Sequence, residues 1–478
     1  MTDFKEAIQN GLFSYIEHRL SRLIDAFADA SIPLYLVGGS VRDLLLNSEI
    51  FHHETLDLDL SFTADFDFTT PAVPDVVETI LGPIASKVWL VGKRFGTVSA
   101  LVDGYQIEIT THRGDKYESE SRKPRVVMPT SLEEDLVRRD FTINAIAVEL
   151  TSANPVLIDP FDGVGDIGRK LLRTPSEAEK SFEDDPLRMV RAARFAAKLE
   201  FEVVPDVKMA MADLVDRLSI VSPERIRDEL NKMLVAPRPS IGLRLLVETG
   251  LAALFLPELP LLKLEQDPIH HHKDVLEHTY SVVDNTECDL ELRLAALFHD
   301  VGKPATRRID SNGVSFHNHD KVGAKMTRRR MRELKYPQTQ IDIVSQLVYL
   351  HLRFHTYQAG WTDRAVRRYV NEAGPLLDRL NALTLADCTT RNENKVIALS
   401  RRMAQLKTRI ADLREREELE SIRPELNGDE IMTILGMSPS KEVGKALDFL
   451  LNVRLDEGLL GRDEIIKRLQ AWWEARSG

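Results

Sequence analysis

The stretches Leu34-Tyr-Leu-Val-Gly-Gly-Ser-Val-Arg-Asp43 and Leu56-Asp-Leu-Asp-Leu60 decide the fold and the chemistry of this chain. In an extended strand, side chains at positions i and i+2 point to the same side, so Asp57 and Asp59 stand together while the leucines beside them face a core. Two carboxylates this close repel each other unless a cation lies between them. Mg²⁺ binds carboxylate oxygens and keeps positions free for substrate phosphates, so the pair predicts a magnesium site.

Gly38 and Gly39 end the first strand and open a helix. Backbone that lacks Cβ atoms can approach a phosphate closely, and a helix N-terminus adds partial positive charge. Arg42, on the first helical turn, is a cation suited to binding a phosphate. Together these features indicate a nucleotidyl-transfer site. They resemble the first motif of the polymerase-β-like nucleotidyltransferases, in the class II form that includes bacterial CCA-adding enzymes and poly(A) polymerases.

The composition allows a multidomain enzyme. At 478 residues the chain is too long for one compact domain, and roughly three or four domains are expected. No apolar run reaches membrane-spanning length, and the first residues lack the pattern of a signal peptide. The two cysteines, Cys288 and Cys388, have no metal-site spacing, so a cytoplasmic location without a membrane partner is expected.

The net charge of −12 argues only weakly against a nucleic-acid partner, because basic residues gather in three places. These are residues 325–335, 364–368 and 401–409. Each cluster fits a solvated helix face as well as an RNA-binding surface, so the sequence leaves both interpretations open.

Strand patterns are confined to the N-terminal part of the chain, after an amphipathic helix over residues 4–30. They fall at 33–37, 56–62, 88–91, 96–102 and 105–111. Asp103-Gly104 between the last two predicts a hairpin. From residue 175 onward, helical patterns dominate.

Further segments of the head match the same family. Glu108 lies on a predicted strand beside the carboxylate pair, and it resembles the third carboxylate of the superfamily. Asp159-Pro-Phe-Asp-Gly163 resembles a later motif, for which a turn without chemistry is the alternative.

Residues 138–145, Arg-Arg-Asp-Phe-Thr-Ile-Asn-Ala, closely resemble the segment that recognises the ribose. By that resemblance Asp140 accepts hydrogen bonds from the ribose hydroxyls. The same resemblance implies that the sugar and phosphates are held by Arg138, Arg139 and Asn144.

Residues 184–195 begin with Asp-Asp-Pro-Leu-Arg and open a helix, for which Asp184 is the expected N-cap. Asp185 and Arg188 are three residues apart and share a helix face. An aspartate accepts from an exocyclic amine and an arginine donates to a ring nitrogen or carbonyl, so one such pair can accept CTP and ATP while rejecting UTP and GTP. A capped helix with a surface ion pair is the alternative. The segment resembles the family's EDxxR motif, which implies that Arg191 also belongs to the nucleotide site.

Two more segments carry the resemblance. Residues 223–232 resemble a neck motif, in which Arg225 and Glu229 are expected to pair at i,i+4. Segment 113–130 is polar and is predicted to be a mobile loop. Within it, Glu120-Ser-Arg-Lys-Pro124 partly resembles the loop that such enzymes need to change from C to A.

Histidines and aspartates gather in the second half of the chain. His278 lies on a predicted helix, His299 and Asp300 end the next helix within Phe-His-Asp-Val-Gly-Lys, and Asp387 follows later. Imidazole with carboxylate is a ligand set for divalent or transition metals. The spaced pattern resembles the HD phosphohydrolase domain, which makes these four residues the expected metal ligands.

Four further histidines of this region follow His299 in the sequence. His319 and His351 are candidates for a second metal, whereas His317 and His355 are expected at the surface or behind the ligands. An inactive domain retained for tRNA docking is the alternative.

The predicted fold is an α/β polymerase-β-like nucleotidyltransferase head followed by all-α neck, HD and C-terminal domains. The head is expected over residues 1–172, the neck over 173–255, the HD domain over 256–392 and a tRNA-binding C-terminal domain over 393–478.

The resemblance implies an enzyme that adds C, C and A to the 3′ end of tRNA from CTP and ATP without a nucleic-acid template, releasing pyrophosphate. Its expected cofactors are Mg²⁺ in the head and a divalent metal of unassigned identity in the HD domain, where phosphatase or phosphodiesterase activity is expected. A poly(A) polymerase and an enzyme that adds only CC share the head motifs and remain alternatives. An HD phosphohydrolase with a nucleotide-binding head is the alternative from another class, against which Asp57, Asp59 and Asp140 count.

Overall fold

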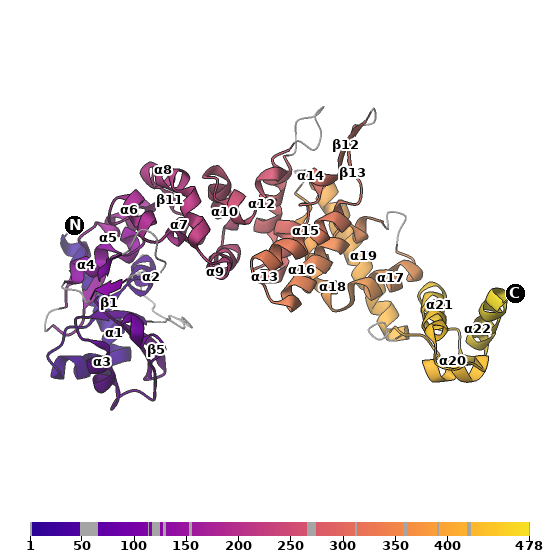
Figure 1. Ribbon diagram of the computed structural model, residues 1–478, viewed down its shortest axis with the longest axis horizontal. Helices are drawn as coiled ribbons and strands as arrows, with labels where there is room; N and C mark the ends of the chain where they lie inside the picture. Colours follow the sequence, from indigo (N-terminus) through magenta and orange to yellow (C-terminus); the bar gives the residue numbers. More distant parts are fainter. Residues whose placement is uncertain are drawn as a thin grey trace. The chain divides into compact units, whose positions relative to one another are not determined.

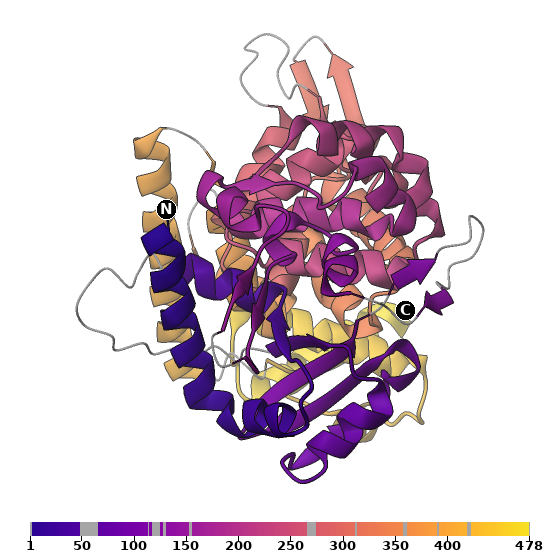
Figure 2. The ribbon, with the colours of Figure 1, turned by 90° about the vertical axis from the view of Figure 1, so that its left-hand side faces the viewer.

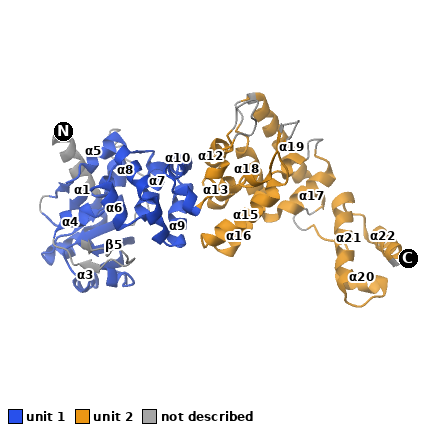
Figure 3. Ribbon diagram, turned by 45° about the horizontal axis from the view of Figure 1, so that its top comes forward, with its two compact units in different colours: residues 1–255 blue, residues 256–478 orange. Residues whose placement is uncertain are grey.

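The computed structural model (Figure 1) describes residues 2–47, 66–112, 114–116, 125–127, 131–152, 155–264, 274–310, 313–356, 361–389, 392–417 and 422–477. The chain forms two compact units, Met1–Phe255 and Leu256–Gly478 (Figure 3). The first contains a mixed α/β region and the second is largely helical, which confirms the predicted fold class. No helix within the described ranges is both long and apolar enough to cross a membrane.

Unit 1 is built on a seven-stranded sheet with the strand order β3-β4-β5-β2-β1-β8-β9. Its strands are β1 (Tyr35–Val37), β2 (Phe66–Thr70), β3 (Lys87–Trp89), β4 (Thr97–Val102), β5 (Tyr105–Thr111), β8 (Ala147–Glu149) and β9 (Leu157–Ile158). β2 and β5 run parallel, whereas the other neighbouring strands are antiparallel. The predicted hairpin is confirmed, because β4 and β5 are joined at Asp103 and Gly104, whose φ angles are 50° and 86°.

The main core of unit 1 lies on one face of this sheet. Phe68 of β2 and Ile109 of β5 are buried there, against the helices α1 (Thr2–Asp29) and α3 (Pro74–Leu81). Burying one phenylalanine side chain stabilises the fold by roughly 1.5–3 kcal/mol. Because neighbouring side chains along a strand alternate, the residues between these positions reach the opposite face.

The rest of unit 1 is mostly helical. Its helices are α2 (Gly39–Asn47), α4 (Leu132–Val137), α5 (Gly163–Arg169), α6 (Ala178–Asp184), α7 (Leu187–Leu199), α8 (Pro205–Asp213), α9 (Pro223–Leu234), α10 (Pro239–Glu248) and α11 (Ala252–Phe255). Three 3₁₀ turns are η2 (Lys93–Phe95), η3 (Thr142–Asn144) and η4 (Val215–Ile220). Two short pairs are antiparallel β6 (Gly114–Lys116) with β7 (Arg125–Val127) and parallel β10 (Leu171–Leu172) with β11 (Glu202–Val203).

The β6–β7 pair corrects part of the loop prediction, because two stretches of segment 113–130 form a ribbon. Residues 120–124, predicted to help change from C to A, lie outside the described residues.

Unit 2 begins with a series of helices, as the helical patterns after residue 175 predict. They are α12 (Val275–Asn285), α13 (Leu290–Phe298), α14 (Lys303–Thr306), α15 (His319–Glu333), α16 (Gln338–Leu350), α17 (Asp363–Ala373), α18 (Leu377–Ala386) and α19 (Glu393–Glu417), with the 3₁₀ turns η5 (Pro260–Leu262), η6 (Arg353–Thr356) and η7 (Gly374–Leu376). A hairpin of β12 (Arg307–Asp310) and β13 (Gly313–Phe316) projects from this unit (Figure 2).

The unit ends with three helices, α20 (Gly428–Leu435), α21 (Lys441–Glu457) and α22 (Arg462–Ser477). They share a small core that includes Leu450 and Leu469. Asn427 opens α20 with a capping box, because its side chain accepts from the Glu430 N–H and the Glu430 carboxylate accepts from the Asn427 N–H, both at 2.9 Å.

Candidate active sites

Two carboxylates meet on the face of the unit 1 sheet that points away from α1. The parallel register of β2 and β5 aligns Asp67 with Glu108, and both side chains are half-buried between fully buried neighbours. Gly38, at the end of β1, has a φ of +75°, and a Cβ built on it would stand 3.7 Å from Asp67 Oδ2. The predicted third carboxylate and the predicted glycine turn therefore converge on Asp67.

The carboxylate pair predicted from the sequence, Asp57 and Asp59, lies outside the described residues. Asp67 was missed, although Asp65-Phe-Asp67 repeats the same i,i+2 spacing only a few residues later. Spacing alone cannot rank two such pairs in apolar surroundings. The register of β2 puts Asp67 beside Glu108 and makes Asp67 a further candidate ligand.

The arginine pair of segment 138–145 is held by a buried carboxylate that the sequence prediction also missed. Asp135 is 0% exposed and accepts hydrogen bonds from Arg138 Nη2 at 2.6 Å and from Arg139 Nη2 at 3.1 Å. Burial raises the pKa of this carboxyl, but the two guanidinium groups lower it further than burial raises it. Arg139 Nη1 lies 3.0 Å from the position of a Cβ on Gly38. Asp135 therefore directs Arg139 towards the glycine turn.

Asp140 is buried and already accepts four hydrogen bonds from the protein. Its Oδ1 accepts from the Phe141 N–H and from Asn144 Nδ2, both at 2.9 Å, and its Oδ2 accepts from Arg191 Nε at 2.8 Å and Nη2 at 2.5 Å. Burial raises the pKa of Asp140, but Arg191 and Asn144 lower it to about 2. A ribose hydroxyl would have to displace one of these donors to reach this carboxylate.

Arg42 is buried at 3% exposure. Its Nη1 donates to Asn144 Oδ1 at 2.6 Å and its Nε donates to Asp43 Oδ1 at 2.7 Å. A Cβ on Gly39 would stand 3.4 Å from Arg42 Nη2, so the arginine also closes the glycine turn from the helix side. The predicted phosphate clamp is therefore engaged with protein groups in this structure.

Asp185, not Asp184, caps α7. Asp184 is the last residue of α6, and Asp185 Oδ1 accepts from the Leu187 N–H at 3.1 Å. The N-cap prediction for Asp184 was therefore wrong by one residue, since Pro186 allows α7 to begin only after a short break. The second carboxylate oxygen, Oδ2, accepts from Arg225 Nη2 at 3.0 Å.

Arg188, the other half of the predicted base-reading pair, is buried and has partners of its own. It donates through Nη1 to Ser181 Oγ at 2.8 Å and through Nη2 to the carbonyl oxygen of Arg138. The helix that carries the predicted reading residues is thereby bonded to segment 138–145.

Glu229 does not pair with Arg225, contrary to the i,i+4 prediction. It is buried, and its Oε2 lies 2.6 Å from Arg194 Nε while its Oε1 lies 3.5 Å from Arg191 Nη1. Burial and the neighbouring Arg191 lower the pKa of Arg194 to about 10. Arg191 and Arg194 both lie over the ring of Phe195, at 5.6 and 4.1 Å from its centroid. The Glu229 carboxylate thus holds two guanidinium groups of α7. These contacts between helices replace the predicted pair of Glu229 with Arg225.

Asp159 has a structural role, as the alternative interpretation of its motif proposed. Its carboxylate accepts from the N–H groups of Gly163 at 2.7 Å and Val164 at 3.0 Å, which caps α5. A Cβ on Gly163 would stand 2.2 Å from the Thr142 carbonyl oxygen, so only glycine allows this contact with the ribose-recognition segment.

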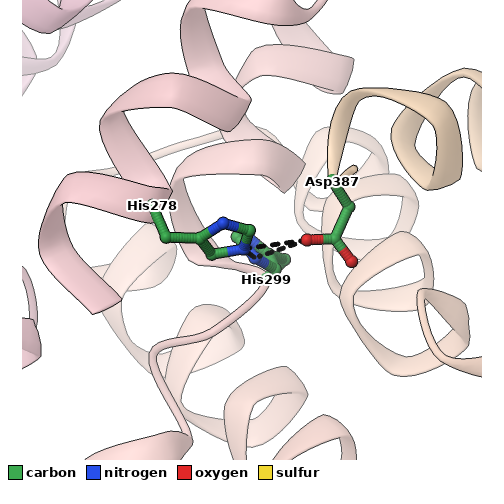
Figure 4. A group of neighbouring side chains, drawn as sticks. All are labelled: His278, His299 and Asp387. Atoms are coloured by element: carbon green, nitrogen blue, oxygen red, sulfur yellow. Dashed lines mark hydrogen bonds and ion pairs between the residues drawn. The ribbon is translucent and has the colours of Figure 1, made fainter. Parts of the chain in front are cut away.

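The second site lies in unit 2, where the ends of helices bring histidines and aspartates together. His278 lies on α12, His299 follows α13 and Asp387 follows α18. His278 Nε2 is 2.9 Å from Asp387 Oδ1 and 3.3 Å from His299 Nε2 (Figure 4). Their ligand atoms lie within 4.8 Å of one another, which suits one metal ion.

A second group joins the first through the His299-Asp300 dipeptide. Asp300, His319 and His351 also place their ligand atoms within 4.8 Å of one another. His299 Nε2 lies 3.1 Å from Asp300 Oδ2, so the two groups are adjacent. Three of the four predicted HD ligands thus form the first group. The fourth, Asp300, forms the second group with His319 and His351, the two histidines predicted for a second metal.

Each imidazole is oriented by a hydrogen bond on the side away from the site. Nδ1 donates to a backbone carbonyl in three of them, at 2.7 Å in His299, 2.7 Å in His319 and 2.6 Å in His351. A carbonyl can only accept, so Nδ1 carries a proton in each of these three rings and Nε2 is the nitrogen that faces the site. In His278, Nδ1 lies 2.8 Å from Thr389 Oγ1.

The donor set fits divalent metal ions. Nε2 of His319 and Nε2 of His351 are buried without a hydrogen-bond partner within the described ranges, which is a costly arrangement unless a ligand completes it. Burial, followed by the neighbouring His299, lowers the pKa of His351 to about 4, so this ring is neutral and ready to coordinate. Burial raises the pKa of Asp300, but His299 and Lys303 hold it well below its usual range.

Gly302 explains how the dipeptide meets α15. A Cβ on Gly302 would stand 2.2 Å from the carbonyl oxygen of His319, so a larger residue would push α15 away from Asp300. His317 is exposed and His355 half-buried, and neither belongs to the two ligand groups.

Known proteins match along nearly the whole chain. Residues 34–173 match the family model of the poly A polymerase head domain, residues 200–262 that of a probable RNA and SrmB-binding site of polymerase A, and residues 269–392 that of the HD domain. An A-adding tRNA nucleotidyltransferase of Deinococcus radiodurans is 34% identical over 93% of this chain and 96% of its own length. A CC-adding tRNA nucleotidyltransferase of Thermus thermophilus is 31% identical over 91% of this chain and 93% of its own.

The fold also resembles that of a solved structure. The CCA-adding enzyme of Bacillus stearothermophilus, in complex with CTP, is 25% identical and covers 96% of this chain and 98% of its own, with a TM-score of 0.68. Fold, site and matches define a nucleotidyltransferase with a polymerase head and an HD domain. The chain belongs to the tRNA nucleotidyltransferase family.

Proposed function

We propose that this enzyme adds C, C and A in turn to the 3′ end of tRNA, from CTP and ATP and without a nucleic-acid template. The observation that carries the proposal is the alignment of Asp67 with Glu108 beside the turn at Gly38. The names of the relatives, which include CC addition, A addition and CCA addition, support tRNA and these two nucleotides as substrates. Both cysteines are free, which suits the cytoplasm as the location.

The reaction is an in-line displacement at the α-phosphorus of the nucleotide. The 3′-hydroxyl oxygen forms a bond to phosphorus, and pyrophosphate leaves with the electron pair of the broken P–O bond. Asp67 and Glu108 would hold Mg²⁺, which would neutralise the phosphate charge, and Asp65 is a further candidate from its i,i+2 spacing in the sequence alone. We assign acceptance of the hydroxyl proton to Glu108, whose Oε1 accepts a hydrogen bond from Ser99 Oγ at 3.3 Å and is thereby oriented.

Arginines on two elements supply positive charge to the same region. Arg139 is directed at the glycine turn by Asp135, and Arg191 and Arg194 are held together by Glu229. Because these guanidinium groups are fixed before a nucleotide arrives, little side-chain freedom is lost when the triphosphate binds.

Replacing Asp185 with alanine is expected to blur the choice of CTP and ATP over UTP and GTP more than it slows addition. Losing one good base contact costs roughly 1–3 kcal/mol of discrimination, or about 5- to 150-fold. The measurement is kcat/KM for each of the four nucleotides.

Serine at position 185 provides the matched control for the helix cap. Serine can cap a helix as aspartate does, but it lacks the second carboxylate oxygen that Arg225 contacts in this structure. If Asp185→Ser keeps full discrimination, Asp185 is only a cap and the base-reading role is wrong.

A second candidate function has a specific observation in its favour. The two relatives that match over nine-tenths of this chain are named for A addition and for CC addition. An enzyme that adds only part of the CCA sequence would use the same catalytic carboxylates. The experiment that separates these functions is addition to tRNA substrates that end before the first C, after one C and after two, each with CTP, ATP or both.

The HD domain is assigned a second activity, hydrolysis of phosphate esters at RNA 3′ ends. Two adjacent ligand groups are the arrangement that stabilises both the attacking and the leaving oxygen in such a displacement. Water attacks phosphorus, and the ester oxygen leaves and is protonated. Histidine and aspartate ligands suit Ni²⁺, Co²⁺, Mn²⁺ and Fe²⁺ as well as Mg²⁺. Removing a terminal 3′-phosphate would free the 3′-hydroxyl that addition needs. Opening a 2′,3′-cyclic phosphate would do so when the bond from phosphorus to O3′ breaks and the phosphate stays on O2′.

A further inference from the structure

The three basic clusters of the sequence differ in how many of their side chains form ion pairs. In the cluster 364–368, Arg364 and Arg368 pair with Asp456 at 3.1 and 2.6 Å, and Arg367 pairs with Glu417 at 2.8 Å. These arginines join α17 to α21 and to the end of α19, so each of them takes part in an ion pair of unit 2.

The cluster 401–409 on α19 is partly engaged in the same way. Arg409 pairs with Asp363, and Arg402 lies over the ring of Phe354 at 5.0 Å from its centroid. Two of the three clusters thus contribute to the packing of unit 2.

The outer face of α15 is different. Lys321, Lys325, Arg328 and Arg332 follow the spacing i, i+4, i+7, i+11, which places them along one stripe of the helix. Three of the four are exposed and Arg328 is half-buried. In the part of the chain that the structure describes, no carboxylate lies within ion-pair distance of these four side chains, which we call the α15 stripe.

The remaining arginines of this helix point elsewhere. Arg330 Nε lies 2.9 Å from the buried carboxylate of Glu258 and its Nη1 lies 2.5 Å from Glu333, while Arg329 lies 3.7 Å from Glu258. The inward face of the helix is buried through residues such as Thr327 and Met331. Arg329, which is exposed, and Arg330, which is largely covered, therefore both have acidic partners, whereas the stripe has none among the described residues.

We propose that the α15 stripe is a docking surface for an RNA phosphate backbone, which presents the RNA 3′ end to the metal groups of the HD domain. The proposal rests on the function assigned above to that domain. The stripe begins two residues after His319, a member of the second ligand group. The chain has a net charge of −12, yet these four neighbouring cations have no counter-ion among the described residues, so they form a surface complementary to a polyanion.

The geometry of the stripe suits a linear polyanion. Steps of three and four residues along a helix advance about 4.5 and 6 Å, so the four cations span about 16 Å in an almost straight line. Single-stranded and duplex RNA both offer phosphates repeated along a line, and cations on a fixed helix can contact several at once.

The test compares two double variants of the full chain that remove the same charge. Lys325→Gln with Arg328→Gln changes the stripe, and Lys87→Gln with Lys180→Gln changes two exposed lysines of unit 1. The probe is a tRNA transcript without its 3′ CCA, and its dissociation constant is measured across a series of salt concentrations. Each lost phosphate contact lowers the slope of log K against log salt by about 0.7–0.9, so the stripe variant should lose about 1.4–1.8 and the control variant nothing.

Charge-conserving changes provide a further control. Lys325→Arg with Arg328→Lys should keep the slope of the unchanged protein, because phosphate contacts need charge rather than one particular head group. An unchanged slope in the glutamine stripe variant, or an equal loss in both glutamine variants, overturns the proposal.

A small substrate distinguishes failure of the docking surface from failure of the HD activity. A 2′,3′-cyclic mononucleotide has no backbone for the stripe to hold, so the stripe variant should hydrolyse it as the unchanged protein does, while its KM for RNA that ends in a cyclic phosphate rises several-fold. If the unchanged protein hydrolyses neither substrate, the HD activity is wrong, whereas the salt slope still decides on the docking surface.

Discussion

Replacing Asp67 with asparagine is expected to lower nucleotide addition by about a thousandfold or more, because several kcal/mol of charge stabilisation at the phosphates depends on metal-binding carboxylates. Asparagine keeps the volume of the side chain but is a poor ligand for a hard cation. Asp67 is half-buried at the middle of β2, so the fold should survive the change. The measurement is the single-turnover rate of CTP addition to tRNA without its 3′ end, with circular dichroism and Tm to confirm folding.

Asp57→Asn and Asp59→Asn are the matched comparison, since they form the pair predicted from the sequence. If Asp65 and Asp67 are the metal-binding pair, these two variants keep most of the activity. Normal addition by a folded Asp67→Asn protein, together with a large loss in either comparison variant, would show that the earlier pair is catalytic and that the register of β2 misled the assignment.

Replacing Asp300 with asparagine should abolish hydrolysis of phosphate esters and leave nucleotide addition within a few-fold of normal. Asp300 belongs to one ligand group and touches His299 of the other, so its loss weakens both metal positions. Asparagine is preferred to alanine because it keeps the volume of the buried side chain and an oxygen that can accept a hydrogen bond from Lys303, although both substitutions remove the same charge. Metal content per chain, measured by mass spectrometry, should fall with the hydrolytic activity.

His317→Ala is the control for this second prediction, because His317 is exposed and outside both ligand groups. It should keep metal and hydrolysis. Loss of both activities in a folded Asp300→Asn protein would contradict the independence of the two sites. Absence of hydrolysis in the unchanged protein with every metal tested would favour an inactive HD domain.

The sequence predicted those features that depend on short spacing. The hairpin at Asp103-Gly104 needs two residues with positive φ, and the HD ligands follow from a dipeptide between helices. For the hairpin, the signal and the structure that it specifies lie within a few residues, whereas the HD residues lie between 278 and 387 and were expected from the family resemblance. The fold class could be predicted for the same reason, since strand and helix patterns are local.

The predictions that failed depended on contacts between distant segments. The i,i+4 spacing favoured Arg225 with Glu229, but Glu229 is buried against Arg191 and Arg194 of another helix, and Arg225 reaches Asp185 instead. The attraction between opposite charges is weak at an exposed helix surface. It is stronger away from water, so a buried carboxylate needs partners there.

Functional residues without a motif of their own were missed for the same reason. Asp135 follows two other acidic residues, so the sequence does not single it out. In the structure it is completely buried and accepts hydrogen bonds from Arg138 and Arg139. Asp67 needed the pairing of β2 with β5, which no spacing in the sequence specifies.

The most direct test of the proposed function is the sequence of the product made from tRNA lacking its 3′ CCA, with all four nucleotides and Mg²⁺ present. We expect tRNA extended by C, C and A and no further, with one pyrophosphate released for each nucleotide added. Product that ends at CC, addition of A only to tRNA that already ends in CC, or a long run of A would contradict CCA addition by this single chain.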